Sequence, residues 1–81
     1  MSQPQSNSNQ AGAEEQVRSL LFDRAAAVHR RLLDRIDAAA EDLGKSNALG
    51  VIGAIEGAEE DIKAIRAFMV LVRDHFPLTT E

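Results

Sequence analysis

Four arginines lie close together in the middle of the first half of the chain. They are Arg24, Arg30, Arg31 and Arg35. Guanidinium groups bind phosphates and carboxylates through paired hydrogen bonds, so these positions form a candidate anion-binding patch for a nucleotide or an RNA backbone. The alternative is a solvated helix face on which Arg30 pairs weakly with Asp34. We favour the solvated face, because charge clusters on helices are usually exposed to water.

The remaining reactive side chains do not form a catalytic or metal-binding pattern. No hydroxyl outside the N-terminal tract has a base and an orienting group at a suitable spacing. Neither histidine has the Glu-x-x-His spacing of helical di-metal sites. We therefore expect no enzyme activity, no cofactor and no metal. The side chains considered are His29, His75, Ser19, Ser46, Thr79 and Thr80.

The segment from Ala39 to Ser46 matches a relaxed phosphate-loop pattern, with alanine in place of the first glycine. A phosphate loop needs a strand before it, whereas the residues before this segment have a helical period. Glu41 and Asp42 would also place negative charge in the anion cradle. We interpret the segment as the end of a helix that Gly44 closes in the left-handed conformation.

Apolar residues on both sides of a polar hinge at 44–47 predict two helices. Before the hinge they recur at steps of three and four residues, which predicts an amphipathic helix over 13–43. After the hinge they form a heptad, which predicts a helix over 48–76 with a buried seam. Ser46 or Asn47 is expected to cap this second helix, and Pro77 to end it. The two patterns are Val17, Leu21, Ala25, Val28, Leu32, Ile36, Ala39 and Leu43, and Val51, Ile55, Ala58, Ile62, Ile65, Met69, Val72 and Phe76.

The expected fold is all-α, an antiparallel two-helix hairpin, because so short a connection forces long helices to run in opposite directions. Residues 1–12 are a polar tract without apolar anchors, and we expect them to be disordered. Residues 77–81 form a short C-terminal tail. The glycines early in the second helix predict close approach of another element, which would offset the helix-destabilising effect of glycine.

Size and composition limit the function classes. With nine basic and thirteen acidic residues the net charge is −4, which argues against non-specific binding of nucleic acid. The longest apolar run, 67–72, is shorter than the roughly 20 residues that cross a bilayer, so we expect no membrane partner. A chain without cysteine and without a signal peptide fits a cytoplasmic setting.

The number of apolar residues predicts self-association. A small chain without disulfides must cover its excess apolar surface by oligomerising. The second helix is apolar on all sides between Phe68 and Val72, so one partner helix cannot cover it. We expect a homo-oligomer, and we favour a dimer that forms a four-helix bundle. The predicted interface residues are Ile55, Ile62, Ile65, Phe68, Met69, Leu71, Val72 and Phe76.

The stretch Ala54-Ile55-Glu56-Gly57-Ala58, with Ala64-Ile65 further on, resembles the Leu-Glu-x-Ala region of phage helical-hairpin proteins that sequester cyclic oligonucleotide signals. That family has leucine where Ile55 stands and more aromatic residues beyond it, so no binding residue is carried over.

The sequence is consistent with two functions from different classes. The first is a non-enzymatic oligomerisation and protein-binding module, such as a small bacterial or phage regulator, adaptor or inhibitor. The alternative is an oligomer that sequesters an anionic ligand, a cyclic nucleotide or RNA, through the arginine patch.

Overall fold

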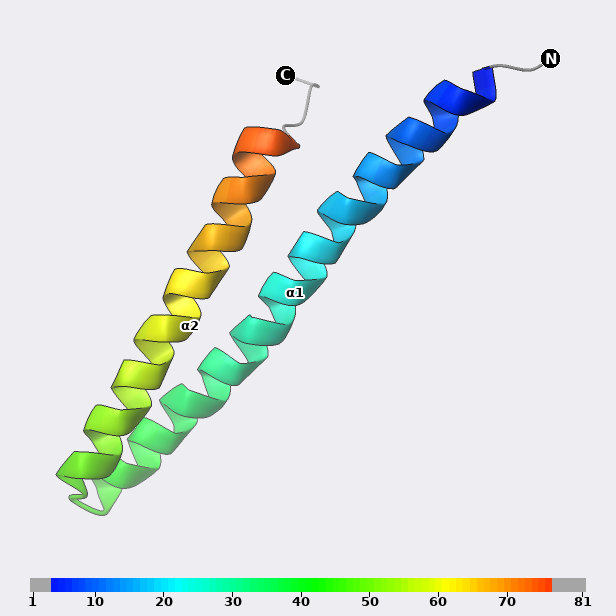
Figure 1. The fold of residues 1–81 in the computed structure, drawn as a ribbon. Helices are drawn as coiled ribbons and strands as arrows, with labels where there is room; N and C mark the ends of the chain where they lie inside the picture. The colour runs from blue at the N-terminus through cyan, green and yellow to red at the C-terminus, as the bar shows by residue number, and fades with distance from the viewer. Residues whose placement is uncertain (1–3, 77–81) are drawn as a thin grey trace.

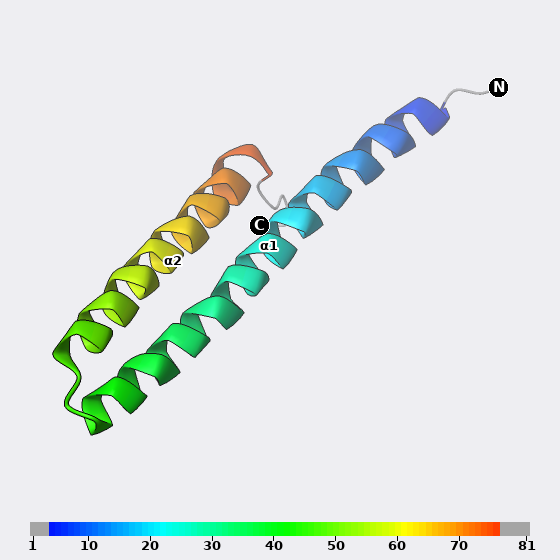
Figure 2. The same ribbon diagram turned by 60° about the horizontal axis from the view of Figure 1, so that its bottom comes forward.

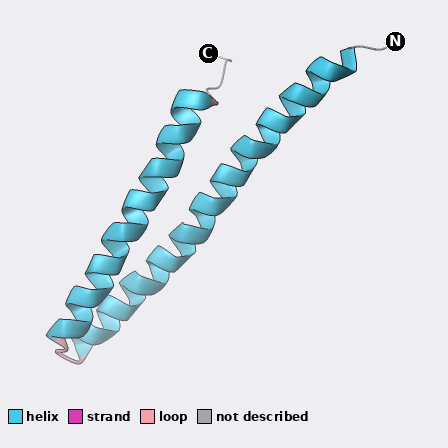
Figure 3. Cartoon of the chain, viewed as in Figure 1, coloured by secondary structure: helices cyan, strands magenta, loops and turns pink. Residues whose placement is uncertain are grey.

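The chain folds into two long helices that run antiparallel and are joined by a tight turn (Figure 1). The structure, a computed structural model, describes the backbone of residues 4–76 and the side chains of residues 12–76. Helix α1 spans Pro4–Gly44 and helix α2 spans Ala48–His75. Helix is the only regular secondary structure in this part of the chain (Figure 3). The predicted all-α hairpin is confirmed.

The start of α1 differs from the prediction, because the helix begins at Pro4 and not at residue 13. Residues 4–12, expected to be disordered, are therefore helical. Adding residues to an existing helix avoids the costly nucleation step, so a polar tract can continue it backwards. Proline is suited to a first helical position because it has no amide hydrogen to satisfy. Residues 1–3 and the predicted tail 77–81 lie outside the described residues.

The turn closes α1 at Ser46 rather than at Gly44. Ser46 has φ 57°, whereas no glycine in the described chain has a positive φ. The Asn47 amide donates to the Asp42 carbonyl at 2.8 Å and the Ser46 amide to the Leu43 carbonyl at 3.1 Å. These two bonds form a Schellman motif, which places the left-handed position at Ser46. The predicted left-handed conformation of Gly44 was wrong, because Gly44 is the last helical residue of α1 and its φ is not positive.

Helix α2 has caps at both ends. The Asn47 side chain accepts a hydrogen bond from the Gly50 amide at 3.1 Å, which confirms one of the two predicted N-caps. At the other end Phe76 is the C-cap, and its amide donates to the Val72 carbonyl at 2.9 Å. The helix thus ends one residue before the predicted limit.

The two helices meet along a seam that differs from the predicted stripes. The residues of α1 that are not exposed recur at alternating steps of three and four, and α2 faces them with a matching heptad. Four seam positions are charged, and the apolar residue next to each of them lies outside the seam and is exposed. These apolar neighbours are Val17, Ile36, Leu43 and Ile62. The seam consists of Arg18, Leu21, Ala25, Val28, Leu32, Arg35, Ala39 and Asp42 on α1, and of Val51, Ala54, Ala58, Asp61, Ile65, Phe68 and Val72 on α2.

The molecule is a rod of 69 × 20 × 18 Å with a thin core. Among the described side chains, Ala25 and Val72 are the buried apolar ones. Helix α1 is longer than α2, so its N-terminal part projects beyond the end of α2 (Figure 2). The helices also diverge away from the turn (Figure 1). A single hairpin therefore leaves much apolar surface uncovered.

Candidate functional site

The most deeply buried side chain in the described structure is a carboxylate in the middle of the seam. Asp61 is only 1% exposed. The Arg31 Nε donates to its Oδ1 at 3.0 Å, and the Arg35 Nε donates to its Oδ2 at 2.8 Å. The Arg31 Nη2 also lies 3.0 Å from Oδ1. Each carboxylate oxygen thus has its own arginine from α1.

Gly57 makes room for this cluster. A Cβ at Gly57 would lie 2.7 Å from the Arg35 Cζ and would also clash with its Nη1. The predicted close approach at the glycines is therefore made here by an arginine side chain from α1. By contrast, nothing lies within 4 Å of a Cβ built at Gly53. The glycine at 57 has a packing role that the glycine at 53 lacks.

The two arginines keep Asp61 ionised. Desolvation by burial would raise the pKa of Asp61, but the hydrogen bonds from Arg31 and Arg35, aided by their charges, hold the pKa below its ordinary value. A carboxylate with a lowered pKa is a poor proton donor at neutral pH. The cluster is suited to aligning the two helices and not to acid catalysis.

The structure divides the predicted anion patch. Arg31 and Arg35 are engaged by Asp61, which neutralises one of their two positive charges. Arg24 lies one heptad before Arg31, on the same side of the hairpin, and is exposed. Arg30 projects from a different face of α1, because adjacent helical residues point about 100° apart. The four arginines do not converge within one chain.

One side of the hairpin gathers exposed apolar residues from both helices. In each helix the residues that follow every second seam position form a row with a spacing of one heptad, and these residues are apolar except for His29. Because α2 runs antiparallel to α1 and faces it, the two rows lie on the same side of the hairpin, opposite to Arg31 and Gly57. Ile36 and Ile62 are 51% and 47% exposed. We call this surface the apolar side, and its residues are Phe22, Ile36, Leu43, Ile55, Ile62, Met69 and Phe76.

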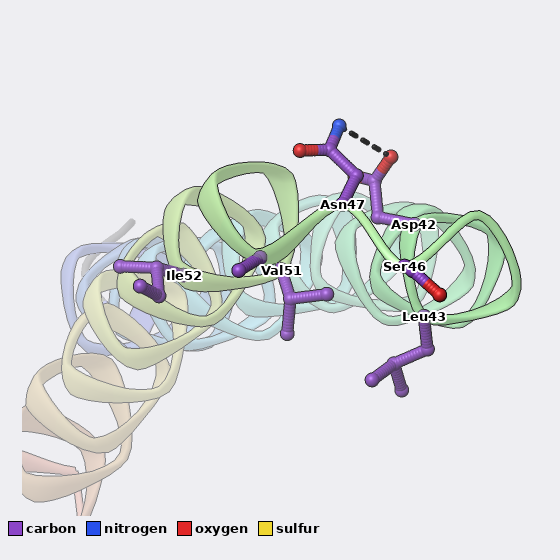
Figure 4. Close-up of a pocket in the computed structure, with 7 residues that line it drawn as sticks. Asp42, Leu43, Ser46, Asn47, Val51 and Ile52 are labelled. Atoms are coloured by element: carbon purple, nitrogen blue, oxygen red, sulfur yellow. Dashed lines mark hydrogen bonds between the residues drawn. The ribbon is translucent and has the colours of Figure 1, made fainter.

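A hollow of about 460 Å³ lies at the turn end (Figure 4). Leu43 and Ile52, which help to line it, are more than half exposed. The Asn47 Nδ2 donates a weak hydrogen bond of 3.4 Å to the Asp42 Oδ1, and the Leu43 side chain lies on the other side of the turn (Figure 4). The hollow is mainly apolar and belongs to the apolar side through Leu43. Its lining residues are Asp42, Leu43, Ser46, Asn47, Ala48, Val51 and Ile52.

The predicted interface residues fall into two groups. Ile65, Phe68 and Val72 belong to the seam with α1 and are half-buried or buried. The others lie at the edge of the seam or outside it. Ile55, Ile62 and Leu71 are exposed, and Met69 and Phe76 are half-buried.

The other candidate groups do not assemble into a reactive site. His29, His75, Ser19 and Ser46 are exposed. The described residues contain no group of histidines and carboxylates that could hold a metal ion. In the phosphate-loop match, the Lys45 amide already donates to the Glu41 carbonyl at 3.1 Å, as expected at a helix end. Thr79 and Thr80 lie outside the described residues.

The ion pairs at the surface differ from the predicted one. Lys63 lies 3.8 Å from Glu60, with both side chains exposed. Arg30 and Asp34 form no ion pair in the described structure, where the pairs besides Asp61 and its arginines are Lys63–Glu60 and Arg73–Asp74. Such exposed contacts have little effect on stability.

Sequence reasoning missed the buried Asp61, although a signal was present. Arg31 and Asp61 are separated by 30 residues, and Ser46 stands midway between them. In an antiparallel hairpin, residues at equal distances from the turn face each other. Opposite charges at symmetric positions around the hinge therefore indicated this pairing.

Comparisons with known protein families, with curated proteins and with solved structures found no match to this chain. Within the described residues, neither helix has an apolar stretch long enough to cross a membrane.

Proposed function

We propose that the protein is a non-enzymatic helical hairpin that pairs with a second copy to form a four-helix bundle and acts as a protein-binding module. The observation that carries this proposal is the apolar side, where exposed apolar residues of both helices lie on the same side of the hairpin. A small cytoplasmic regulator, adaptor or inhibitor of bacterial or phage origin is the kind of protein that fits this description.

The energetics support pairing. Soluble monomers rarely expose contiguous apolar patches larger than a few hundred Å². Covering the exposed half of an isoleucine or leucine side chain is worth about 1 kcal/mol. Ile36, Leu43, Ile55 and Ile62 are each close to half exposed or more. Their burial against a second copy would add substantially to the thin core of Ala25 and Val72.

Protein binding is supported by surface that pairing through the apolar side leaves uncovered. Leu49 is 82% exposed at the start of α2 and points away from that side. Val17 and Leu20, both exposed, lie on α1 where it begins to extend past the end of α2. Exposed apolar residues at such projecting ends are typical contact points for a partner helix.

The alternative, sequestration of an anionic ligand, has weaker support. Asp61 engages Arg31 and Arg35, which leaves Arg24 and Arg30 on different faces of α1. An anion site would require arginines from neighbouring copies to converge. Calorimetry with cyclic and linear nucleotides at two salt concentrations tests it, since phosphate binding by arginine weakens as salt rises.

Light scattering tests the pairing. The chain has a mass of 8.8 kDa, and we expect the wild type to have about twice that mass at micromolar concentration. Ile62→Glu should yield monomers, because it places an unpaired carboxylate in the interface. Ala67→Glu is the matched control, since Ala67 is exposed on the outer face of the same helix. A monomeric wild type would overturn the proposal.

Affinity capture from the native host tests the binding role. We expect wild-type protein to retain a specific protein, detected by mass spectrometry, and Leu49→Glu to lose it while remaining dimeric. Retention of a small anion or of RNA, with no protein retained, would favour the alternative function.

A further inference from the structure

We propose that the second copy lies on the apolar side in the opposite direction, with the two turns at opposite ends, so that Phe22 and Phe76 of each copy close the hollow at the turn of the other. This orientation rests on the proposed pairing and adds to it the direction of the partner and the residues that it contributes.

The row on α2 is symmetric about Ile62. Its heptad positions are Ala48, Ile55, Ile62, Met69 and Phe76. If a twofold axis passes beside Ile62, the two copies of Ile62 face each other and Ile55 faces Met69. The smallest residue, Ala48, then faces the largest, Phe76. Alternation of small and large residues across an interface is the arrangement that packs without voids.

The row on α1 is centred at the same level of the hairpin. Its positions are Phe22, His29, Ile36 and Leu43, and the middle of this row falls between Leu32 and Leu33. The contacts of Asp61 with Arg31 and Arg35 bring this level of α1 beside Asp61, the residue before Ile62. One twofold axis therefore relates both rows at once. It places Phe22 opposite Leu43 and His29 opposite Ile36.

The shape of the apolar side favours the same direction. The turn end carries the hollow of about 460 Å³, lined by Ala48 and Val51, while the open end carries the aromatic side chains. Opposite turns bring each aromatic end against a hollow. Turns at the same end would place Phe22, Met69 and Phe76 of both copies together and leave both hollows unfilled.

Cysteine crosslinking tests the direction, because the natural chain contains no cysteine. A disulfide requires Cα atoms no more than about 7 Å apart. With turns at opposite ends, Ile62→Cys lies beside its own copy, so we expect a disulfide-linked dimer under mild oxidation. With turns at the same end, the two cysteines would lie on diagonal helices and stay reduced. Ala67→Cys, on the outer face, should remain monomeric on a non-reducing gel in either case.

A mixing experiment is independent of the Ile62 site. Phe22→Cys and Leu43→Cys should form a mixed disulfide when combined, and neither variant should link to itself. A wild-type dimer by light scattering with neither the Ile62→Cys disulfide nor the mixed disulfide would overturn the direction and leave the proposed pairing standing. A wild-type monomer would overturn both.

Discussion

Asp61 and its two arginines decide how the helices align. A buried carboxylate held by Arg31 and Arg35 is strongly position-dependent, since moving α2 by one residue would remove Asp61 from both partners. Such buried ion pairs contribute more to the choice of one alignment than to net stability, because burial of the charge opposes the attraction. The cluster therefore sets which faces of the hairpin remain outside.

Replacing Asp61 tests this role. Asp61→Asn should lower Tm by roughly 5–10 °C, because it leaves two arginines beside a buried neutral group. The partial exposure of both arginines limits the loss. Asp74→Asn is the matched control, because Asp74 pairs with Arg73 at the surface. It should change Tm by less than about 2 °C. Equal effects in thermal melts would contradict the role given to Asp61.

The lowered pKa of Asp61 predicts a pH dependence. Because the folded pKa lies below the ordinary value of 3.8, the stability from this group is present above that pH and is lost as pH falls through the folded pKa. Melts from pH 7 to pH 2 should show a fall in Tm below about pH 4 that is shallower in Asp61→Asn. An unchanged slope would show that other carboxylates dominate the acid loss.

Ser46 carries backbone strain that glycine would relieve. The left-handed conformation costs a residue with a side chain about 1 kcal/mol relative to glycine. Ser46→Gly should therefore raise the free energy of unfolding by about 0.5–1 kcal/mol, measured by urea titration. Ser46→Val should lower it. Gly44→Ala tests the opposite preference: because φ there is not positive and a Cβ meets nothing within 4 Å, alanine should stabilise the helix end.

The two helices, α1 and α2, differ in how many faces need a packing partner. Helix α2 has a heptad row on each side of Val51, Ala58, Ile65 and Val72. One row faces α1 through Ala54, Asp61 and Phe68, and the other faces outward through Ile55 and Ile62. An α-helix with two adjacent heptad rows is suited to the interior of a bundle, where it meets two neighbours. Within the described residues, the first part of helix α1 extends beyond the end of α2.

The projecting part of α1 predicts the effect of truncation. Deleting residues 2–11 should change Tm by less than about 2 °C, because residues 4–11 lie beyond the end of α2 (Figure 2). The helical signal at 222 nm should nevertheless fall, since residues 4–11 are helical. A Tm loss of more than about 5 °C would show that these residues pack on a partner copy.

The whole molecule is too elongated for one hairpin to be a stable globule. Its Cα radius of gyration is 19.0 Å, whereas a compact chain of this length would have about 12 Å. With few buried apolar side chains, the hairpin has little to offset the entropy of ordering two long helices. We therefore expect the proposed pairing to be coupled to folding.

Coupling of folding and association predicts a concentration-dependent Tm. The wild-type Tm should rise by a few degrees for each tenfold increase in protein concentration, because binding of a second copy stabilises the folded state by mass action. Scanning calorimetry between about 5 and 500 μM measures this change. Ile62→Glu should melt at a lower temperature that does not depend on concentration. A constant wild-type Tm would contradict coupled folding.

The local pattern was sufficient for the two helices and their antiparallel order, and it reduced the N-cap of α2 to Ser46 or Asn47, because helical period, capping and a short connection depend on neighbouring residues. It did not predict that Pro4 begins α1. A polar tract becomes helical when it extends an existing helix, and its own composition does not show this. It also misplaced the left-handed residue, which hydrogen bonds across the turn put at Ser46.

Which row of each helix faces inward was decided by tertiary structure alone. Ile62 and Asp61 are adjacent, and both continue a heptad with Val51, Ala58 and Ile65, so periodicity favours the apolar one. In the folded hairpin Asp61 lies inside, because Arg31 and Arg35 from the other helix satisfy its carboxylate and Gly57 gives them space. A local sequence pattern does not reveal a partner so distant along the chain. Because Asp61 and Arg35 face inward, their neighbours Ile62 and Ile36 face outward.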